Sequence, residues 1–551
     1  MPAFDLLIRG GALVDGTGDP ARPADVGIVG DRIRAVGDLA GAPGYRVVEA
    51  DGRCVSPGFI DIHSHSDVGI LQDATAENAV RQGMTLHVTG NCGVSPAPVA
   101  EATRHLAEQE FPHHDHPVAY TWSTFREYLD AVERSGVGVN VAPLVGHGNV
   151  RMAELGYAQR PPTAEEMDRM RAHVEEAMRA GAFGLSTGLV YPTGCFAETD
   201  EIVALAEVAA RHGGMYASHI RGERESVVDA VRECIEIGER SGCRTQISHN
   251  APKYGGSHLL PQVISLWEDA RERGLDVAVD NDIHTDLGWP LRAGLPQWTH
   301  ELTADDLLAL LASPERQREL IAETVEDARP AYGPVGLLKH GVWDRVWLLP
   351  GPAVGEDAGR TIAEVAARGG MDGWAAYLDR IVTSRGAAEG LFDYIDIEVV
   401  KAVARHPMVM LCSDGWVLPR GGNRASQPPY IPCAYGEFPG VIERFVVRES
   451  ILSLEEAVRK MTSMPASRLG LADRGRVAPG MAADVVVFEP ERVRDRATNL
   501  FPHDPITEHY PHDFPEGIDW VLVNGAIAVE EGEPSGAVAG RVLRSPSYRP
   551  A

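Results

Sequence analysis

Six side chains that can bind a metal ion or a proton each follow a short apolar run. They occur in the segments "PGFIDIHSHSD", "TLHVTGNCG", "MYASHI", "TQISHN" and "VMLCSDG", and they are His63, His65, Cys92, His219, His249 and Asp414. Apolar runs of this length are typical of buried strands. Imidazole nitrogen, thiolate sulfur and carboxylate oxygen are ligands that Zn²⁺ prefers. The pattern therefore predicts a zinc site at which an activated water attacks a polarised substrate.

The spacing of the histidines supports this prediction. His63 and His65 are two residues apart, so a β-strand would place both side chains on one face, where they can hold one ion. Taken singly, His219 and His249 each fit a buried histidine that only forms hydrogen bonds. Cys92 lies beside glycines that allow a sharp turn under an ion, and its alternative is a buried, inert thiol. Together these residues indicate metal ligands.

Asp414 directly follows the apolar run "PMVMLCS". A buried carboxylate without a partner is costly, so this one needs a cation or a proton. We expect it to act as a general base that takes a proton from water and delivers it to the leaving nitrogen. The alternative is a structural role as a helix N-cap.

Eight strand-like segments alternate with helical patterns and would position these residues. A helix is predicted in "TAEEMDRMRAHVEEAMRA" and another, ending at a glycine, in "ESVVDAVRECIEIGERSG". Eight such units indicate an α/β TIM barrel, whose strands bring their C-terminal ends to one face. The predicted strands are Phe59–His65, Thr85–Gly90, Val139–Gly146, Phe183–Leu189, Met215–Ile220, Thr245–Asn250, Asp276–Asp282 and Val409–Asp414.

The remaining segments predict two further parts. Residues 1–55 and 470–551 carry short alternating runs separated by Gly and Asp, which indicate a small β-sandwich domain built from both termini, or else two unrelated hairpins. Residues 56–284 and 405–469 would form the barrel. Residues 285–404 are too long for one crossover between strands seven and eight, so we expect an inserted subdomain that serves as a lid or an oligomer contact.

Composition narrows the class of protein. The 551 residues include 51 basic and 79 acidic ones, for a formal net charge of −28, which disfavours nucleic acid and anionic membranes as partners. Seven cysteines without a compact spacing do not form a disulfide framework. No secretory signal and no apolar stretch of about 20 residues is evident, so a cytoplasmic protein is expected. Homo-oligomer formation stays open.

These motifs resemble the amidohydrolase superfamily, and within it the N-acyl-D-amino-acid deacylase (D-aminoacylase) branch. The resemblance also includes "FDLLIRGGALVDGTG", "GLSTGLVYPTG" and "GRVAPGMAADVVVFEP". It implies that Cys92 and His219 hold a tightly bound zinc with Asp414 close to it. His63, His65 and His249 would form a second, weaker metal position. Tyr191 matches a family tyrosine near the substrate carbonyl, where it would stabilise the developing oxyanion. The alternative is a structural tyrosine that packs under the barrel rim.

Three positions depart from the branch, and all three concern the substrate's carboxylate. Relatives have a lysine two residues after the strand-six histidine, where this chain has Ala251, with Lys253 displaced by two. Asp282 stands where relatives have a tyrosine, and Cys433 where they have an arginine. An aspartate would repel an anion. We therefore expect altered carboxylate recognition, unless Lys253 and two further residues replace the lost partners, namely Arg420 and Arg424.

The leading function is hydrolysis of a linear amide, a small-molecule substrate, by a zinc enzyme. A cyclic amide or imide hydrolase, or a deaminase, on the same barrel is the enzymatic alternative, because a fold does not fix a function. A remote alternative is an interaction scaffold that has lost its metal. The presence of all six candidate metal-site residues argues against it.

Overall fold

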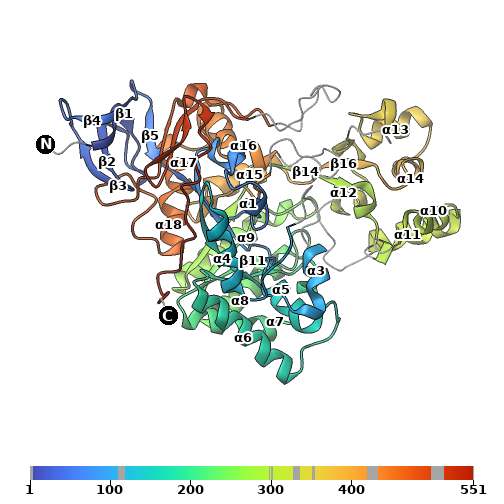
Figure 1. Ribbon diagram of the computed structural model, residues 1–551. Helices are drawn as coiled ribbons and strands as arrows, with labels where there is room; N and C mark the ends of the chain where they lie inside the picture. Colours follow the sequence, from blue (N-terminus) through green and yellow to red (C-terminus); the bar gives the residue numbers. More distant parts are fainter. Residues whose placement is uncertain are drawn as a thin grey trace.

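The computed structural model describes residues 4–109, 118–296, 298–299, 302–326, 335–349, 354–418, 432–497 and 514–549 (Figure 1). Each of the eight predicted segments contains a parallel strand, which confirms their assignment. In chain order these strands are β6 (Phe59–Asp61), β7 (Met84–Thr89), β8 (Asn140–Pro143) continued by β9 (Val145–Gly146), β10 (Gly184–Gly188), β11 (Met215–His219), β12 (Arg244–Ile247), β13 (Val277–Asn281) and β17 (Val409–Leu411).

The parallel strands pair in sequence order. One ladder runs β6–β7–β8 and the other β9–β10–β11–β12–β13–β17. Only Leu144 separates β8 from β9, and a parallel bridge between Ser64 and Gly415 joins the segments that follow β6 and β17. Neighbouring parallel strands end at the same edge, so the residues that follow them are brought together.

Helices cover the strands and follow local sequence signals. In α6 (Ala164–Ala180), Thr163 and Glu166 form a capping box, and Gly181 ends the helix with a φ of 109°. Helix α8 (Val227–Ser241) ends at Gly242, as its glycine predicted. The others in this part are α1 (Gly69–Gln72), α2 (Glu77–Val80), α3 (Arg104–Gln109), α4 (Phe125–Ser135), α5 (His147–Leu155), α7 (Thr199–Arg211), α9 (Leu260–Glu272), α15 (Ile397–Arg405), α16 (Cys433–Gly440), α17 (Leu454–Met461) and α18 (Ser463–Leu469).

Strands from the two ends of the chain share one nine-stranded sheet. The contact is made by β5 (Cys54–Pro57), which pairs antiparallel with β18 (Val485–Phe488). Val26, Ile33 and Val485 belong to the apolar cluster that this sheet buries. The remaining strands are β1 (Phe4–Leu13), β2 (Arg22–Val29), β3 (Arg32–Gly37), β4 (Gly44–Glu49), β19 (Ile518–Val523), β20 (Ala526–Glu530) and β21 (Glu533–Pro534).

A separate group of elements lies between β13 and β17 in the chain and projects to the right in Figure 1. It has its own buried apolar cluster, which includes Leu337, Ile362 and Tyr377. Its antiparallel sheet is ordered β14 (Asp286–Pro290), β16 (Glu389–Asp393) and β15 (Val346–Leu348), and its helices are α10 (Ala304–Leu311), α11 (Pro314–Glu326), α12 (Val335–Lys339), α13 (Ile362–Gly369) and α14 (Gly373–Thr383).

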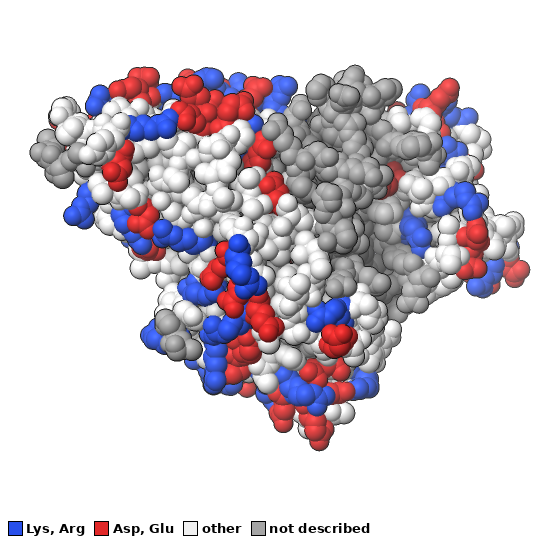
Figure 2. Space-filling model, viewed as in Figure 1, with Lys and Arg blue, Asp and Glu red and all other residues white. Residues whose placement is uncertain are grey.

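The surface reflects the charged composition. Figure 2 shows acidic and basic side chains interspersed over the lower part of the molecule, where α6, α7 and α8 lie. None of the helices in the described ranges is long and apolar enough to cross a membrane.

Candidate metal centre

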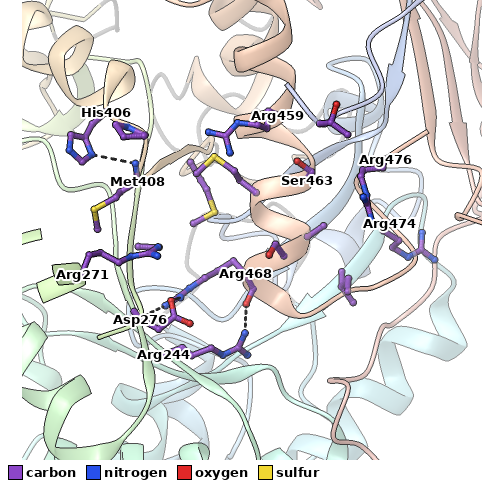
Figure 3. Close-up of a pocket in the computed structure, with 18 of the residues that line it drawn as sticks. Arg244, Arg271, Asp276, His406, Met408, Arg459, Ser463, Arg468, Arg474 and Arg476 are labelled. Carbon is purple, nitrogen blue, oxygen red and sulfur yellow. Dashed lines mark hydrogen bonds and ion pairs between the residues drawn. The ribbon is translucent and has the colours of Figure 1, made fainter. Parts of the chain in front are cut away.

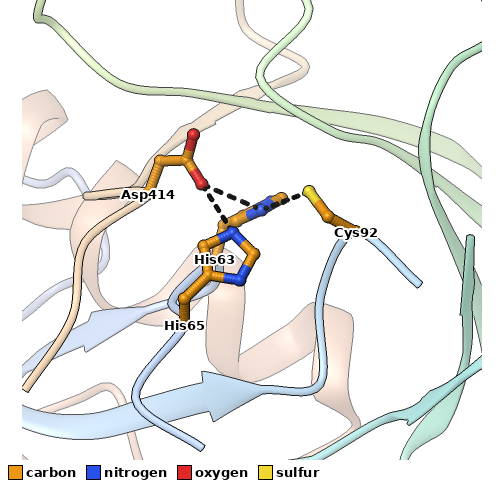
Figure 4. Close-up of side chains that lie close together, drawn as sticks. All are labelled: His63, His65, Cys92 and Asp414. Atoms are coloured by element: carbon orange, nitrogen blue, oxygen red, sulfur yellow. Dashed lines mark hydrogen bonds and ion pairs between the residues drawn. The ribbon is translucent and has the colours of Figure 1, made fainter. Parts of the chain in front are cut away.

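Side chains that are up to 351 positions apart in the sequence meet beyond the C-terminal ends of the parallel strands. The Sγ atom of Cys92 lies 3.3 Å from His63 Nε2, and it lies 3.6 Å from Nδ1 of His219 and 3.4 Å from Nε2 of His249. Asp414 Oδ1 lies 3.0 Å from His65 Nε2 and 3.3 Å from His63 Nε2 (Figure 4). The structure thus brings all six residues into one cluster.

The backbone turns sharply at three of these residues. Cys92, His249 and Asp414 have φ angles of 50°, 32° and 51°. Left-handed backbone is uncommon for residues other than glycine and gathers at functional sites. Next to the cysteine, Gly93 also has a positive φ, and a Cβ there would lie 2.5 Å from a backbone nitrogen. The sharp turn that the glycines beside Cys92 predicted is present, and the absence of a side chain at Gly93 lets it pack closely.

The His-x-His pair does not lie within a strand, contrary to the sequence argument. Strand β6 ends at Asp61, and His63 and His65 follow it in an irregular turn. Backbone hydrogen bonds hold this turn to the segment after β17: Asp414 donates to the carbonyl of His63, and His65 donates to that of Gly415, at 2.9 and 2.8 Å. The pair is positioned by this link and not by strand alternation.

The electrostatics of the cluster favour the ionised forms of the Cys92 and Asp414 side chains. Burial opposes ionisation of the Cys92 thiol, but the charges of His63 and His249 and hydrogen bonds from the histidines hold the pKa of Cys92 well below its usual range. Burial likewise opposes the Asp414 carboxylate, yet His63 and His65 lower the pKa of Asp414 to about 2. A thiolate and a carboxylate are the forms that bind a cation.

Two carboxylates that sequence reasoning missed, the buried Asp280 and the half-buried Glu223, hold the histidines in place. Asp280 Oδ1 lies 3.2 Å from His63 Nδ1 and accepts the backbone N–H of His249 at 2.8 Å. Glu223 places one oxygen 3.4 Å from His219 Nε2 and the other 3.4 Å from His249 Nδ1. Carboxylates commonly orient metal-binding histidines in this way. Their signals were an acid in an otherwise apolar strand and an acid four residues after a candidate ligand.

The predicted substrate residues are placed unevenly. The hydroxyl of Tyr191 lies 3.1 Å from His219 Nδ1. Lys253 is buried, with Nζ 3.7 Å from Glu223 Oε1 and 5.6 Å from the ring centre of Tyr394. Asp282 is half-buried, and this burial raises its pKa, whereas the positive charge of Lys253 acts to lower the pKa of Asp282. The other two predicted residues lie outside the described part of the chain, namely Arg420 and Arg424.

The donor set fits a zinc ion. Metal-binding atoms of His63, His65, Cys92 and Asp414 all lie within 4.8 Å of one another, and so do those of Cys92, His219 and His249. Thiolate and imidazole suit Zn²⁺ far better than the hard cations Mg²⁺ and Ca²⁺, which prefer oxygen. Two overlapping groups that share the cysteine offer two neighbouring metal positions.

Comparison with known proteins identifies the family. The sequence pattern of the amidohydrolase family matches residues 46–529. This chain belongs to the amidohydrolase family. It is 36% identical over 544 residues to the N-acyl-D-glutamate deacylase of Alcaligenes xylosoxydans xylosoxydans, a match that covers 98% of this chain and 96% of that protein. The resemblance to the D-aminoacylase branch is confirmed.

Solved structures agree with this assignment. The amidohydrolase superposes with a TM-score of 0.75 and 32% identity on the N-acyl-D-glutamate deacylase of Bordetella bronchiseptica, over 98% of this chain and all of that one. That crystal structure contains zinc and a phosphonate inhibitor that mimics the tetrahedral intermediate. A D-aminoacylase with a binuclear metal centre matches with the same TM-score, identity and coverage. The predicted enzyme class, a metal-dependent hydrolase of carbon–nitrogen bonds other than peptide bonds, is confirmed.

Proposed function

We propose that this amidohydrolase cleaves a linear amide with the aid of zinc held by the cluster around Cys92. The observation that carries the proposal is the convergence of one thiolate, four imidazoles and one carboxylate at a single strand edge. Cys92 and His219 would hold the tighter zinc, and His63, His65 and His249 the second position. Bound zinc supplies Lewis acidity and makes water a nucleophile at neutral pH.

Asp414 would move the proton during the reaction. Its Oδ1 faces the donor atoms of the cluster, and its low pKa keeps it ionised at neutral pH. It would accept a proton from the attacking water and deliver that proton to the amide nitrogen as the C–N bond breaks. The amine then leaves in neutral form, and the acyl group leaves as a carboxylic acid.

Tyr191 would stabilise the developing oxyanion. Its hydroxyl lies beside His219, at the edge of the cluster, where a substrate carbonyl next to Cys92 and His219 can be reached. Hydroxyl donors aimed at a developing negative charge contribute more in a water-poor site than in solution.

The substrate's amine portion is proposed to carry a neutral or cationic group where relatives would bind a carboxylate. The buried cation Lys253 already has Glu223 at 3.7 Å, and it also interacts with Asp282. Two carboxylates beside one ammonium leave this part of the site negative, which disfavours a free carboxylate. Tyr394 adds an aromatic wall beside Lys253.

Turnover of paired substrates tests both the cleavage of a linear amide and the altered recognition of the substrate's carboxylate. Zinc-loaded enzyme is assayed with N-acetyl-D-amino acids and with their carboxamides, and the released amine is measured separately from ammonia. The proposal expects amine release with higher kcat/KM for the carboxamides. Efficient cleavage of the free acids alone would refute the altered recognition, and ammonia as the only nitrogen product would refute linear amide cleavage.

We further infer the division of the chain into three parts: a β-sandwich domain of residues 1–55 and 470–551, a TIM barrel of residues 56–284 and 405–469, and an inserted subdomain of residues 285–404. The sheet shared by both termini and the separate apolar cluster, which extends from Leu291 to Phe392, support it, whereas α15 at the end of the third range packs in the main core. Tyr394 of the insertion borders Lys253, which supports a role of the insertion at the active site.

A further inference from the structure

The N-terminal ends of the parallel strands border a cavity of about 1170 Å³ that the proposed reaction does not use. Arg244 begins β12, and Asp276 directly precedes β13. His249 and Asp414, by contrast, follow the C-terminal ends of β12 and β17. The cavity and the candidate metal centre therefore lie at opposite ends of the strands.

Arginine dominates the lining of this cavity. Acidic residues exceed basic ones in the whole chain, yet among the described residues only three acidic ones line the cavity, namely Glu268, Glu272 and Asp276. Figure 3 shows Arg271 and Arg459 pointing toward the central space from different sides. The lining arginines are Arg244, Arg271, Arg459, Arg468, Arg474 and Arg476.

Three of the arginines are neutralised by carboxylates. Arg459 donates twice to Glu456, at 2.7 and 2.8 Å, and Arg474 pairs with Asp484. Arg468 Nη1 donates to the carboxylate of Asp276 at 2.7 Å.

The other three, Arg244, Arg271 and Arg476, have no carboxylate of a described residue within 4 Å. Carbonyl groups nevertheless hold two of them in place. Arg244 donates to the carbonyls of Arg468 and Gly213, at 2.8 and 3.0 Å, and Arg271 donates through Nε to the carbonyl of Val277.

The guanidinium groups repel one another. Burial, and then the charges of Arg244 and Arg271, lower the pKa of Arg468 to about 10, although Asp276 opposes this. Three guanidinium groups thus lie near one another around the first residues of β12 and β13, and of these Arg468 alone pairs with a carboxylate of a described residue, that of Asp276. A bound anion would relieve this repulsion and meet donors that are already positioned.

We propose that this cavity binds a small organic anion with two or more negative charges, in the form of a phosphate ester or a polycarboxylate. Guanidinium groups match the oxygens of both groups with paired hydrogen bonds. The volume of about 1170 Å³ is slightly above the range of about 300–1,000 Å³ that is usual for small-molecule sites, so it can admit such an anion. Met408, Met410 and Met464 also line the cavity and would contact the apolar part of the ligand. The proposal is independent of the amide hydrolysis.

Calorimetric titration of the zinc-loaded full chain at low salt tests it, with inorganic pyrophosphate and citrate as probes. We expect saturable binding near one equivalent. Arg244→Gln and Arg271→Gln would each weaken it by about fivefold or more, since each removes a unit charge near the anion. The matched control is Arg273→Gln. Arg273 directly follows α9, the helix that contains Arg271, but it pairs with Glu239 and does not line the cavity. The affinity of this variant should equal that of the wild type.

Tighter binding of pyrophosphate assigns a phosphate ligand, and tighter binding of citrate assigns a carboxylate ligand. The proposal would be overturned if neither probe bound saturably at concentrations up to about 5 mM, because a dissociation constant above that value is too weak for a physiological ligand. Binding that both Gln variants leave unchanged would also overturn it, because the anion would then occupy another place, such as the metal centre. Zinc content measured after each titration shows that the probes have not removed the metal. Arg271 is exposed, so its variant remains informative even if Arg244→Gln folds poorly.

Discussion

The Nδ1 atom of His63 lies 3.2 Å from Oδ1 of Asp280, and both side chains are buried. Asp280 accepts hydrogen bonds from the backbone of His249 and the side chain of Gln246, at 2.8 and 2.7 Å. One carboxylate on β13 therefore orients two histidines of the candidate metal centre.

Replacing Asp280 by Asn is expected to lower zinc affinity by about 10- to 100-fold, because the histidines lose the carboxylate that orients them and makes them more basic. Competition with a chromophoric chelator measures this. Asp269→Asn, an exposed change on the neighbouring helix α9, is the control. Wild-type affinity in Asp280→Asn would show that the contact has no role in metal binding.

Removal of the metal is expected to abolish amide hydrolysis in the wild type, and added zinc should restore it. Cys92→Ser should regain little activity under the same conditions, since a serine hydroxyl is a much poorer zinc ligand than a thiolate. Metal content and amine release are measured in parallel. Full activity of carefully demetallated wild-type protein would contradict the zinc mechanism.

Asp414→Asn is expected to lower kcat by about 10²- to 10⁴-fold, the usual contribution of a general base. Zinc bound with high affinity should remain, because Cys92 and His219 are unchanged. Steady-state kinetics together with metal analysis checks both parts. A variant that loses its zinc would identify Asp414 as a required ligand instead.

Asp282→Asn is expected to raise kcat/KM for N-acyl amino acids with a free carboxylate by about fivefold, since one repulsive charge beside the substrate is removed. Carboxamide substrates serve as the internal control and should change little. Lys253→Met should act in the opposite direction on the free acids. Equal effects of Asp282→Asn on acids and amides would argue against a charge effect.

The buried ammonium of Lys460 should make stability depend on pH. Its Nζ donates to the carbonyls of His406 and Val409, at 2.6 and 2.8 Å, and burial lowers the pKa of Lys460 to about 8. The unfolded chain, in which the lysine pKa is higher, then binds more protons above pH 8. The cost of burying the charge is fully present below pH 8 and is relieved as pH rises above it.

Relative to Lys460→Met, the wild type should therefore gain about 1–2 kcal/mol of unfolding free energy between pH 8 and 9.5. Urea denaturation at several pH values measures the difference. Lys401→Met is the control, because Lys401 is paired with Glu398 and Glu449 and the pKa of Lys401 is raised. A pH-independent difference between wild type and Lys460→Met would contradict the prediction.

The sequence by itself determined the eight parallel strands and the set of side chains that meet beyond their ends. Parallel strands end at one edge, so His219, the last residue of β11, and His249, which follows β12, converge there. Local signals also determined helix ends, such as the capping box at Thr163 and the stop at Gly242. These features depend on residues that are near one another in the chain.

Only the tertiary structure decided which carboxylates support the site. Asp280 Oδ1 lies 3.2 Å from Nδ1 of His63, and Glu223 links His219, four residues before it, to His249 on another segment, each at 3.4 Å. No local pattern encodes the contact of Asp280 with His63 or that of Glu223 with His249. Likewise, the arginine-lined cavity gathers Arg244, Arg271 and Arg476 from distant parts of the chain. The physical reason is that the partner of a buried charge is chosen by the packing of whole elements, whereas the side chain at a strand end is chosen by the strand itself.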